Sequence, residues 1–391
     1  MNIIVQQNRT KLAKGEEKMG KKVTIDKNDL YALLNGASKF FPKKATVAIL
    51  DCYKIDVTPT AFKVTVSSTD ASIERSIPIM GFDTFEACVD RSILGMIGKC
   101  PSGSITLEFM EYNTLEITAG KAVFKVALLD SRQYPALPKT EEGEGVSVSA
   151  KEFEELLKGV EFALAENGAA NKTMTSVNLR IKDGKLTVTA LDGYRIAIQT
   201  RNVKSELDVN INVPAMSKFI NSMDSNDDIQ ISWDNSHVVM TSSDCKVVCR
   251  LIEGNFFNVD GLMKRNTVSE VTIDRESFMG SLERAALMSK GDSSKSPVVV
   301  ELEDEIMILQ MEEVKGKFVE TLLGEHGYTK SGSNLRLGFN TKYLLEALNK
   351  ISDKTVKLLF SGKNTPLFIK SADREKEESY SHIIVPVNIN R

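Results

Sequence analysis

The chain has 391 residues, 42% of them hydrophobic, which is enough to form two or three domains with substantial cores. Its 50 basic and 53 acidic side chains give a formal charge of −3. The chain therefore lacks the overall basic excess that usually indicates nucleic-acid binding. The five cysteines form no CxxC pair and the three histidines are widely spread, which argues against a zinc site.

We expect no metal and no cofactor, and the lack of a secretory signal or a long apolar segment predicts a cytoplasmic protein. Residues 1–21 are polar and charged and are predicted to form an N-terminal extension. A short alternating strand at 23–26 then leads into a helix at 30–41 whose apolar residues recur on one face. A second helix is predicted at 89–99, and a strand follows at 105–109.

The same order of elements occurs twice more along the chain. The matching strands and helices are expected at 146–149, 153–164, 215–223 and 229–233, and again at 271–274, 278–288, 342–351 and 356–360. The first strand of each repeat ends in Asp26, Ser149 or Asp274, which are good helix N-caps. The pattern predicts an α+β fold of three repeated domains, each with two helices and several strands. The predicted domains span residues 22–140, 145–262 and 268–391.

Basic residues recur on the helix faces that lie opposite the apolar stripes. These candidate DNA-binding residues are Lys39, Lys43, Lys44, Arg91, Lys158, Lys218, Arg284 and Lys342. Taken one helix at a time, an ordinary solvated surface explains each of them well. Their recurrence instead favours a single band of cations that contacts phosphates without reading bases.

Three segments resemble one known family. Residues 190–197, ALDGYRIA, are similar to the ATDGHRLA segment of the β subunit of bacterial DNA polymerase III, the replicative sliding clamp. Residues 338–348, GFNTKYLLEAL, and 380–387, YSHIIVPV, resemble the family segments GFNxxYLLxxL and YxxMPVRL. Residues 22–50 and 250–258 are also similar, so the resemblance covers about residues 22 to 389.

The resemblance implies a DNA-clamp fold that closes as a head-to-tail homodimeric ring, with helices lining the inside and antiparallel sheets outside. The ring encircles duplex DNA without regard to sequence, and the family has no catalytic centre. Its partners are the DNA polymerase III catalytic subunit, the clamp loader and repair proteins, and no membrane association is expected. The alternative is a three-repeat protein-interaction scaffold that does not encircle DNA. An enzyme is a weaker interpretation, because no nucleophile elbow or phosphate-binding loop motif occurs.

The family's partner pocket lies between its second and third domains and receives short linear motifs. Carried over to this chain, the resemblance implies a pocket formed by Met174, Leu191, Gly193, Tyr194, Arg195, Ile196, Ile229, Pro366, Ile383, Val385, Pro386 and Val387. An ordinary C-terminal strand would explain the apolar residues from Ile383 onward equally well. Asp192 is expected to cap a turn and Arg195 to be exposed. Leu191 replaces a threonine of the family and Tyr194 replaces a histidine, while Phe257 and Asn258 replace Pro-Asp.

Ring closure in the family pairs the first domain of one subunit with the third domain of the next. The matching residues of this chain are Phe124, Val126, Phe278 and Leu282. Phe278 and Leu282 also fit the apolar stripe of a helix, so packing in the core explains them equally well.

Overall fold

The computed structural model describes residues 21–389 except positions 46, 82, 111, 139–144, 167–168, 217–219, 221–222, 224–226, 265, 289–296, 314–315, 374–375 and 377–378. The predicted N-terminal extension therefore lies, up to residue 20, outside the described residues. The chain divides into two compact units, one formed by Met1–Pro138 with Asp244–Val247 and the other by Lys139–Ser243 with Val248–Arg391. Among the described residues, no helix is long and apolar enough to cross a membrane.

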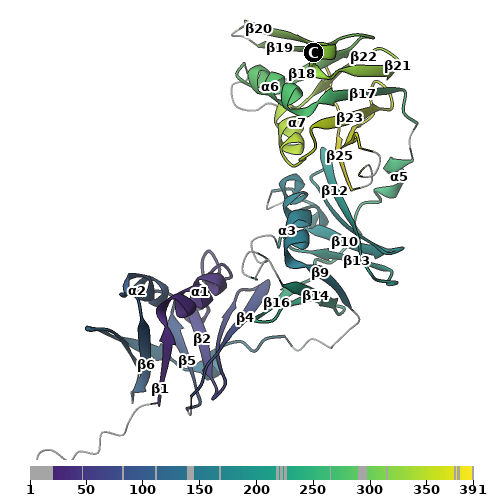
Figure 1. The fold of residues 1–391 in the computed structure, drawn as a ribbon. Coiled ribbons are helices and arrows are strands. Elements are labelled where there is room, and N and C mark those ends of the chain that lie inside the picture. The colour runs from purple at the N-terminus through teal and green to yellow at the C-terminus, as the bar shows by residue number, and fades with distance from the viewer. Residues whose placement is uncertain are drawn as a thin grey trace, which may run out of the picture. The chain divides into compact units, whose positions relative to one another are not determined.

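The first unit is an antiparallel sheet with two helices (Figure 1). Its strands are β1 (Lys21–Asp26), β2 (Cys52–Val57), β3 (Ala61–Ser67), β4 (Ala71–Pro78), β5 (Phe85–Asp90), β6 (Ser104–Met110), β7 (Thr114–Ala119) and β8 (Ala122–Leu129). They lie in the order β1-β6-β7-β8-β5-β2-β3-β4. Helix α1 (Lys27–Ser38) begins where the Asp26 carboxylate accepts a hydrogen bond from the backbone N–H of Asn28 at 2.7 Å.

The second helix of this unit is shorter than predicted. Helix α2 spans Ile93–Lys99, whereas the sequence predicted a helix from residue 89. Val89 instead belongs to β5 and pairs with Tyr53 on β2. The prediction of the helix start was wrong because pairing with a distant strand, which the local pattern does not encode, takes up residues 85–90.

The central part of the chain contains short helices and eight strands among the described residues. The helices are α3 (Ala150–Lys158) and α5 (Asp260–Met263), with 3₁₀ turns at Glu161–Ala163 and Lys172–Thr175. The strands are β9 (Gly145–Ser149), β10 (Val177–Lys182), β11 (Lys185–Leu191), β12 (Arg195–Asn202), β13 (Val209–Val213), β14 (Asp228–Trp233) and β15 (His237–Thr241); β16 (Cys245–Arg250) follows. Helix α3 ends six residues before the predicted limit of 164, and the helix predicted at 215–223 falls largely outside the described residues.

The last part of the chain packs two helices against two sheets. Helices α6 (Arg275–Ala286) and α7 (Thr341–Leu348) lie side by side (Figure 1). The strands are β17 (Ser269–Asp274), β18 (Val298–Leu302), β19 (Met307–Glu313), β20 (Gly316–Leu322), β21 (Thr329–Gly332), β22 (Leu335–Phe339), β23 (Thr355–Phe360), β24 (Leu367–Ser371) and β25 (Tyr380–Ile384). A four-stranded sheet has the order β20-β19-β18-β22, and its inner face joins the core around Phe278, Phe339 and Phe360.

One continuous sheet joins the central and third domains. Its order is β13-β10-β11-β12-β25-β24-β23-β17-β21, so β12 of the central domain is hydrogen-bonded directly to β25 of the third. Ile196 lies opposite Ile383, and Arg195 lies opposite Ile384. Figure 1 shows these two strands side by side. The junction brings together segments nearly two hundred residues apart in the sequence, and it positions the candidate site.

Candidate functional site

An apolar row of side chains crosses the junction between the two domains. Directly opposed residues of paired strands point to the same face of a sheet. Leu191 lies opposite Ile196, Ile196 opposite Ile383, and Ile383 opposite Phe368, which lies opposite Leu359. We call these five residues the apolar row. Ile196 is half-buried, whereas Leu191, Phe368 and Ile383 are buried.

A tight turn closes one end of the apolar row. The Asp192 carboxylate accepts hydrogen bonds from the backbone N–H groups of Tyr194 (2.9 Å) and Arg195 (3.0 Å), so Asp192 caps the turn as predicted. Gly193 has a φ of +91°, and a Cβ added there would lie 4.0 Å from the Cε atom of Met174. Tyr194 is exposed, and its carbonyl accepts a hydrogen bond from the N–H of Val385 at 2.9 Å.

Arg195 is buried, with 8% of the residue exposed, so the expectation of an exposed arginine was wrong. Its guanidinium donates to Asp192 Oδ2 at 3.0 Å, to the carbonyl of Phe162 at 2.7 Å, and to the carboxylate of Glu346. The same group lies over the ring of Tyr343, 4.3 Å from its centroid. Because Glu346 and Tyr343 belong to α7, Arg195 links the central domain to the third. Its guanidinium is already engaged in these contacts, so it has little capacity left to bind a ligand.

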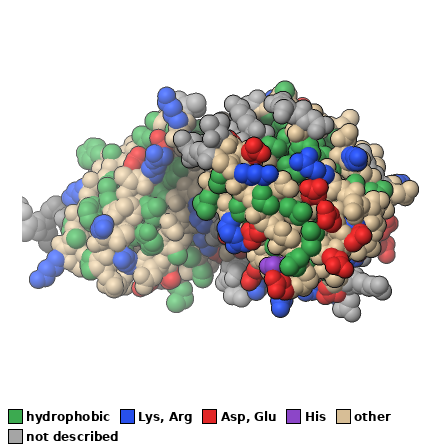
Figure 2. Space-filling model, turned by 90° about the horizontal axis from the view of Figure 1, so that it is seen from above, with side chains coloured by type: hydrophobic (Ala, Val, Ile, Leu, Met, Phe, Trp, Pro, Cys, Tyr) green, Lys and Arg blue, Asp and Glu red, His purple; other side chains and the backbone are tan. Residues whose placement is uncertain are grey.

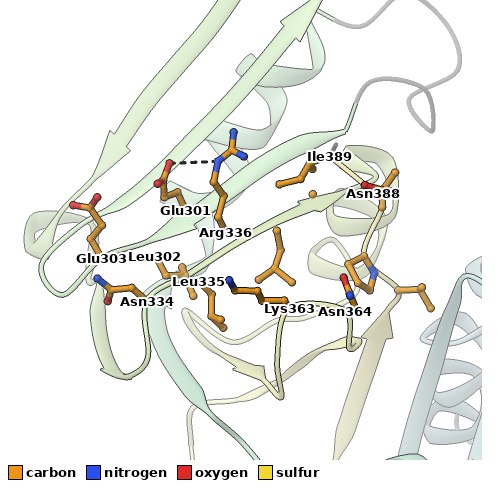
Figure 3. Close-up of a pocket in the computed structure, with 15 residues that line it drawn as sticks. Glu301, Leu302, Glu303, Asn334, Leu335, Arg336, Lys363, Asn364, Asn388 and Ile389 are labelled. Atoms are coloured by element: carbon orange, nitrogen blue, oxygen red, sulfur yellow. Dashed lines mark ion pairs between the residues drawn. The ribbon is translucent and has the colours of Figure 1, made fainter. Parts of the chain in front are cut away.

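A pocket of about 790 Å³ continues from the end of β25 onto the third domain (Figure 3). Val385, Pro386 and Val387 line it, and the N–H of Val387 donates to the carbonyl of Gly338 on β22 at 2.7 Å. The other lining residues of the third domain are Glu301, Leu302, Glu303, Asn334, Leu335, Arg336, Leu337, Lys363, Asn364, Asn388 and Ile389. The lining combines leucines with charges of both signs, as in the Glu301–Arg336 pair that Figure 3 marks.

Two further residues that were predicted to line the pocket, Pro366 and Ile229, lie in different parts of the fold. Pro366 is half-buried and directly precedes β24, whose Leu367 lies opposite Ile384, so it is close to the junction. Ile229 lies on β14 opposite Val148 and is fully buried. Its side chain therefore belongs to the core of the central domain and does not line the pocket. No sequence pattern indicated Phe368 or Leu359, because only strand pairing brings them to the junction. Tyr343 is the tyrosine of the family-like segment 338–348, but only helix packing places it at the junction.

His382 lies beneath the junction, opposite Ala197 on β12 and Ile369 on β24. It is fully buried, and neither ring nitrogen has a hydrogen-bond partner among the described residues. Its ring stacks on Tyr380, with centroids 5.6 Å apart, and meets the edge of Phe162 at 5.5 Å. Burial lowers the pKa of this imidazole from 6.5 to about 3, because the charged form would lose its hydration.

The predicted DNA-binding cations are exposed wherever the structure describes them, and Lys218 lies outside the described residues. Four of them face a carboxylate of the same chain: Arg91 with Asp51 at 3.0 Å, Lys158 with Glu154 at 2.6 Å, Arg284 with Glu320 at 2.5 Å, and Lys342 with Glu346 at 3.9 Å. The hydrogen bond to Glu320 raises the pKa of Arg284. Figure 2 shows basic and acidic side chains interspersed on the face in view. These pairings weaken the positive potential, so contacts with phosphates would be weak and sensitive to salt.

Two strands that are largely without a neighbour on one side, β8 and β20, carry exposed apolar side chains. Strand β8 pairs along its length with β7, but with β5 only through Leu128 and Leu129. Phe124 and Val126 on this strand are half-buried, and the neighbouring Val123 is 54% exposed. Strand β20 ends the four-stranded sheet of the third domain, and its Val319 is 53% exposed.

The other two predicted interface residues lie in the interior. Phe278 and Leu282 on α6 are 1% and 0% exposed, within the core of the third domain. Their side chains are covered by their own chain, so they present no surface to a second subunit. The apolar helix stripe of the sequence therefore describes core packing.

Comparison with known proteins gives matches along nearly the whole chain. Family models for the N-terminal, central and C-terminal domains of the DNA polymerase III beta subunit match residues 21–138, 147–258 and 262–388. The beta sliding clamp of Staphylococcus epidermidis is 26% identical over 377 residues, covering 93% of this chain and 98% of the relative. A putative DNA polymerase III beta subunit from Eubacterium rectale is 28% identical with a TM-score of 0.86, covering 95% of this chain and all of that one. A sliding clamp from Pseudomonas aeruginosa bound to griselimycin has a TM-score of 0.88 at 18% identity, covering 95% of this chain and 100% of that one.

Proposed function

We infer, since the chain belongs to the DNA polymerase III beta subunit family, that it is a DNA sliding clamp, a non-catalytic factor that keeps the replicative polymerase on its template. The observation that carries this proposal is the succession of three family domains over residues 21–388, in the family's own order. The chain has the three-domain β-clamp fold, with antiparallel sheets and few helices. We keep the predicted domain limits of 22–140, 145–262 and 268–391 as part of the proposal.

The proposed ring is a head-to-tail homodimer in which β8 of one subunit meets β20 of the next. β20 is the edge strand of its sheet, and β8 is paired with β5 only at Leu128 and Leu129, so most of one side of each strand is without a neighbouring strand among the described residues. The two strands have similar lengths, eight and seven residues. An exposed apolar edge invites pairing with another strand, and a heterologous contact closes into a ring when the rotation permits. The apolar side chains of Val123 and Val319 would be covered by this pairing.

The proposed grip on DNA is topological. A chain with a net charge of −3 and several cations paired to carboxylates cannot rely on a strong positive field. Encirclement requires only weak phosphate contacts, which keep the duplex central and let the ring slide. The exposed Lys39, Lys43 and Lys44 are candidates for such contacts. We place the protein in the cytoplasm, where bacterial DNA is replicated.

The proposed partner site consists of the apolar row with the adjoining third-domain pocket. An extended peptide could bury an apolar side chain over half-buried Ile196 and continue past exposed Val385 to Val387. Exposed Tyr194 stands at the end of the row as an amphipathic wall, with Tyr343 stacked 6.5 Å away. The partners we propose are the polymerase catalytic subunit, the clamp loader and repair proteins.

Retention on circular DNA tests the proposal. The labelled protein is loaded onto nicked circular duplex by a bacterial clamp loader, and half of the sample is then cut once with a restriction enzyme. We expect the protein to stay on circles through gel filtration and to leave the linear molecules by sliding off the ends. Equal loss from both forms would favour the scaffold interpretation and refute the clamp.

A further inference from the structure

A second hollow, of about 490 Å³, lies within the first unit where the end of α1 meets the start of α2. We call it the α1–α2 hollow. Its lining includes Ser38 and Phe41 at and after the end of α1, Tyr53 on β2, and Arg91 and Gly95 before and in the first turn of α2. The two helices pack against each other on one face of the sheet (Figure 1), and in the proposed ring this face lines the channel.

An aromatic pair forms the floor of the α1–α2 hollow. The side chain of Tyr53 is fully buried, and its hydroxyl donates to the carbonyl of Leu34 at 3.1 Å, which fixes the ring. The ring of half-buried Phe41 meets the Tyr53 ring edge to face, with centroids 4.8 Å apart and 79° between the planes. This packing orients the Phe41 ring, which lines the hollow. A fixed aromatic ring is the kind of surface on which unpaired bases stack.

The guanidinium of Arg91 lies over the Phe41 ring, 5.8 Å from its centroid. Asp51 positions Arg91, because its carboxylate pairs with the guanidinium at 3.0 Å and its carbonyl accepts from the backbone N–H at 2.9 Å. Stacked bases are spaced about 3.4 Å apart, so a base between two planar groups needs a separation of about 6.8 Å. The Arg91 side chain is 49% exposed, so an outward movement of about 1 Å would admit a base.

The wall of the hollow suits a base better than a phosphate. Asp90 lines it, and one oxygen of its carboxylate accepts from the backbone N–H of Ser92 at 2.9 Å. A carboxylate repels a phosphate, but it accepts hydrogen bonds from the amino group of a base such as cytosine. The volume of the hollow also lies within the range of small-molecule pockets, about 300–1,000 Å³.

Cations for the flanking phosphates belong to the same segment of the chain. Lys39, Lys43 and Lys44 lie within three residues of Phe41 in the sequence, and all three are exposed. An aromatic ring with exposed cations beside it is the combination that binds single-stranded nucleic acids. An apolar peptide would gain nothing from these charges, so the charge distribution favours a nucleic acid as the occupant.

We propose that the α1–α2 hollow binds one unpaired base of single-stranded DNA, which stacks on Phe41 beneath Arg91 while its phosphates contact the neighbouring lysines. Stacking uses only the flat face of a base, so the site tolerates any sequence. The inference rests on the proposed function, because a ring around duplex DNA meets unpaired bases where the duplex ends. A bound base would hold the ring at that boundary.

Fluorescence anisotropy with two labelled probes of about 12 nucleotides tests the inference. One probe is an oligomer of deoxycytidine, and in the other every base is replaced by an abasic residue, which keeps the phosphates. At low salt we expect the intact protein to bind the deoxycytidine probe at least about tenfold more tightly, because only this probe can stack. Equal affinity for the two probes would refute the inference.

Two variants locate the bound base. Gly95→Leu fills the hollow, since a Cβ added to Gly95 meets nothing within 4 Å, and leucine favours a helix more than glycine does. Phe41→Leu keeps an apolar contact with Tyr53 but removes the flat ring. Both variants should lose the preference for the deoxycytidine probe. Gly81→Leu, which also adds a side chain in open space, and Tyr112→Leu, which removes an exposed aromatic of the first unit, should keep it.

Retention on circular duplex DNA, measured with the same proteins, separates this inference from the proposed function. If the parent is retained on circles but the base preference survives in both Gly95→Leu and Phe41→Leu, the base binds elsewhere; the inference is then refuted while the clamp stands. If the parent is not retained on circles, the clamp is refuted, and the role given to the hollow fails with it.

Discussion

Replacing His382 should make the junction between the central and third domains more stable and less sensitive to acid. The imidazole is buried with both nitrogens unpartnered among the described residues, between Tyr380 and Phe162. Leucine has a similar volume and no polar atoms. At pH 8, where the histidine is neutral in both states, His382→Leu should raise the free energy of unfolding by about 1–3 kcal/mol, the usual cost of an unsatisfied buried polar group.

The pH dependence follows from the lowered pKa of His382. Burial reduces this pKa from 6.5 to about 3, so below pH 6.5 the unfolded chain binds a proton that the folded chain does not. The contribution to stability is complete above pH 6.5 and is lost as the pH falls toward 3. Between pH 8 and pH 5 the loss is about 2 kcal/mol, from about 1.4 kcal/mol per unit of pH below 6.5.

Denaturant unfolding followed by tryptophan fluorescence measures this effect. The single tryptophan, Trp233, lies on β14 of the central domain. The unfolding free energies of the parent and of His382→Leu are compared at pH 8 and pH 5, so that the other titrating groups cancel. The difference between the two proteins should widen by about 2 kcal/mol at pH 5. His237→Gln, which changes a half-buried histidine 3.5 Å from Asp234, serves as the control. An equal difference at both pH values would refute the reasoning.

Three further predictions concern the ring, the junction and the DNA contacts. Val319→Lys should weaken the proposed dimer more than tenfold in sedimentation equilibrium, because it places a charge on an apolar edge; an unchanged dimer would exclude β20 from the interface. Arg195→Met should lower the unfolding free energy by about 3 kcal/mol by removing the buried guanidinium that is bonded to both Asp192 and Glu346 at the junction, and a change below 1 kcal/mol would contradict this role. The double variant Lys39→Glu and Lys43→Glu should shorten retention on circular DNA at low salt but much less at high salt; salt-independent retention in both proteins would exclude phosphate contacts by these lysines.

The local features of the fold were predicted well from the sequence. The strand at the start of each repeat and the helix after it were expected from alternation and helical spacing, and Asp26 and Asp274 both cap their helices. At Asp274 the carboxylate accepts a hydrogen bond from the N–H of Ser277 at 2.8 Å. Ser149 occupies the same position without such a side-chain bond. These features depend on residues within one turn of each other, so their pattern is readable in a single stretch of sequence.

The candidate site was predicted only in part. The resemblance gave Leu191, Ile196 and Ile383, which the sheet register does bring into one row. It also gave Ile229, which is buried elsewhere, and Phe278, which lies in a core. A buried helix stripe and a subunit contact are both apolar, so spacing alone does not separate them.

The sequence by itself determined the threefold repeat, the element types and the family resemblance, because each is written in residues that are close together in the chain. Only the tertiary structure decided that buried Arg195 bonds to Glu346, 151 residues away, and that neither ring nitrogen of enclosed His382 is hydrogen-bonded to a described residue. It also decided that side chains from five strands far apart in the sequence form one apolar row. Strand order and register set all three, and pairing between distant segments depends on the packing of the whole sheet rather than on either segment alone.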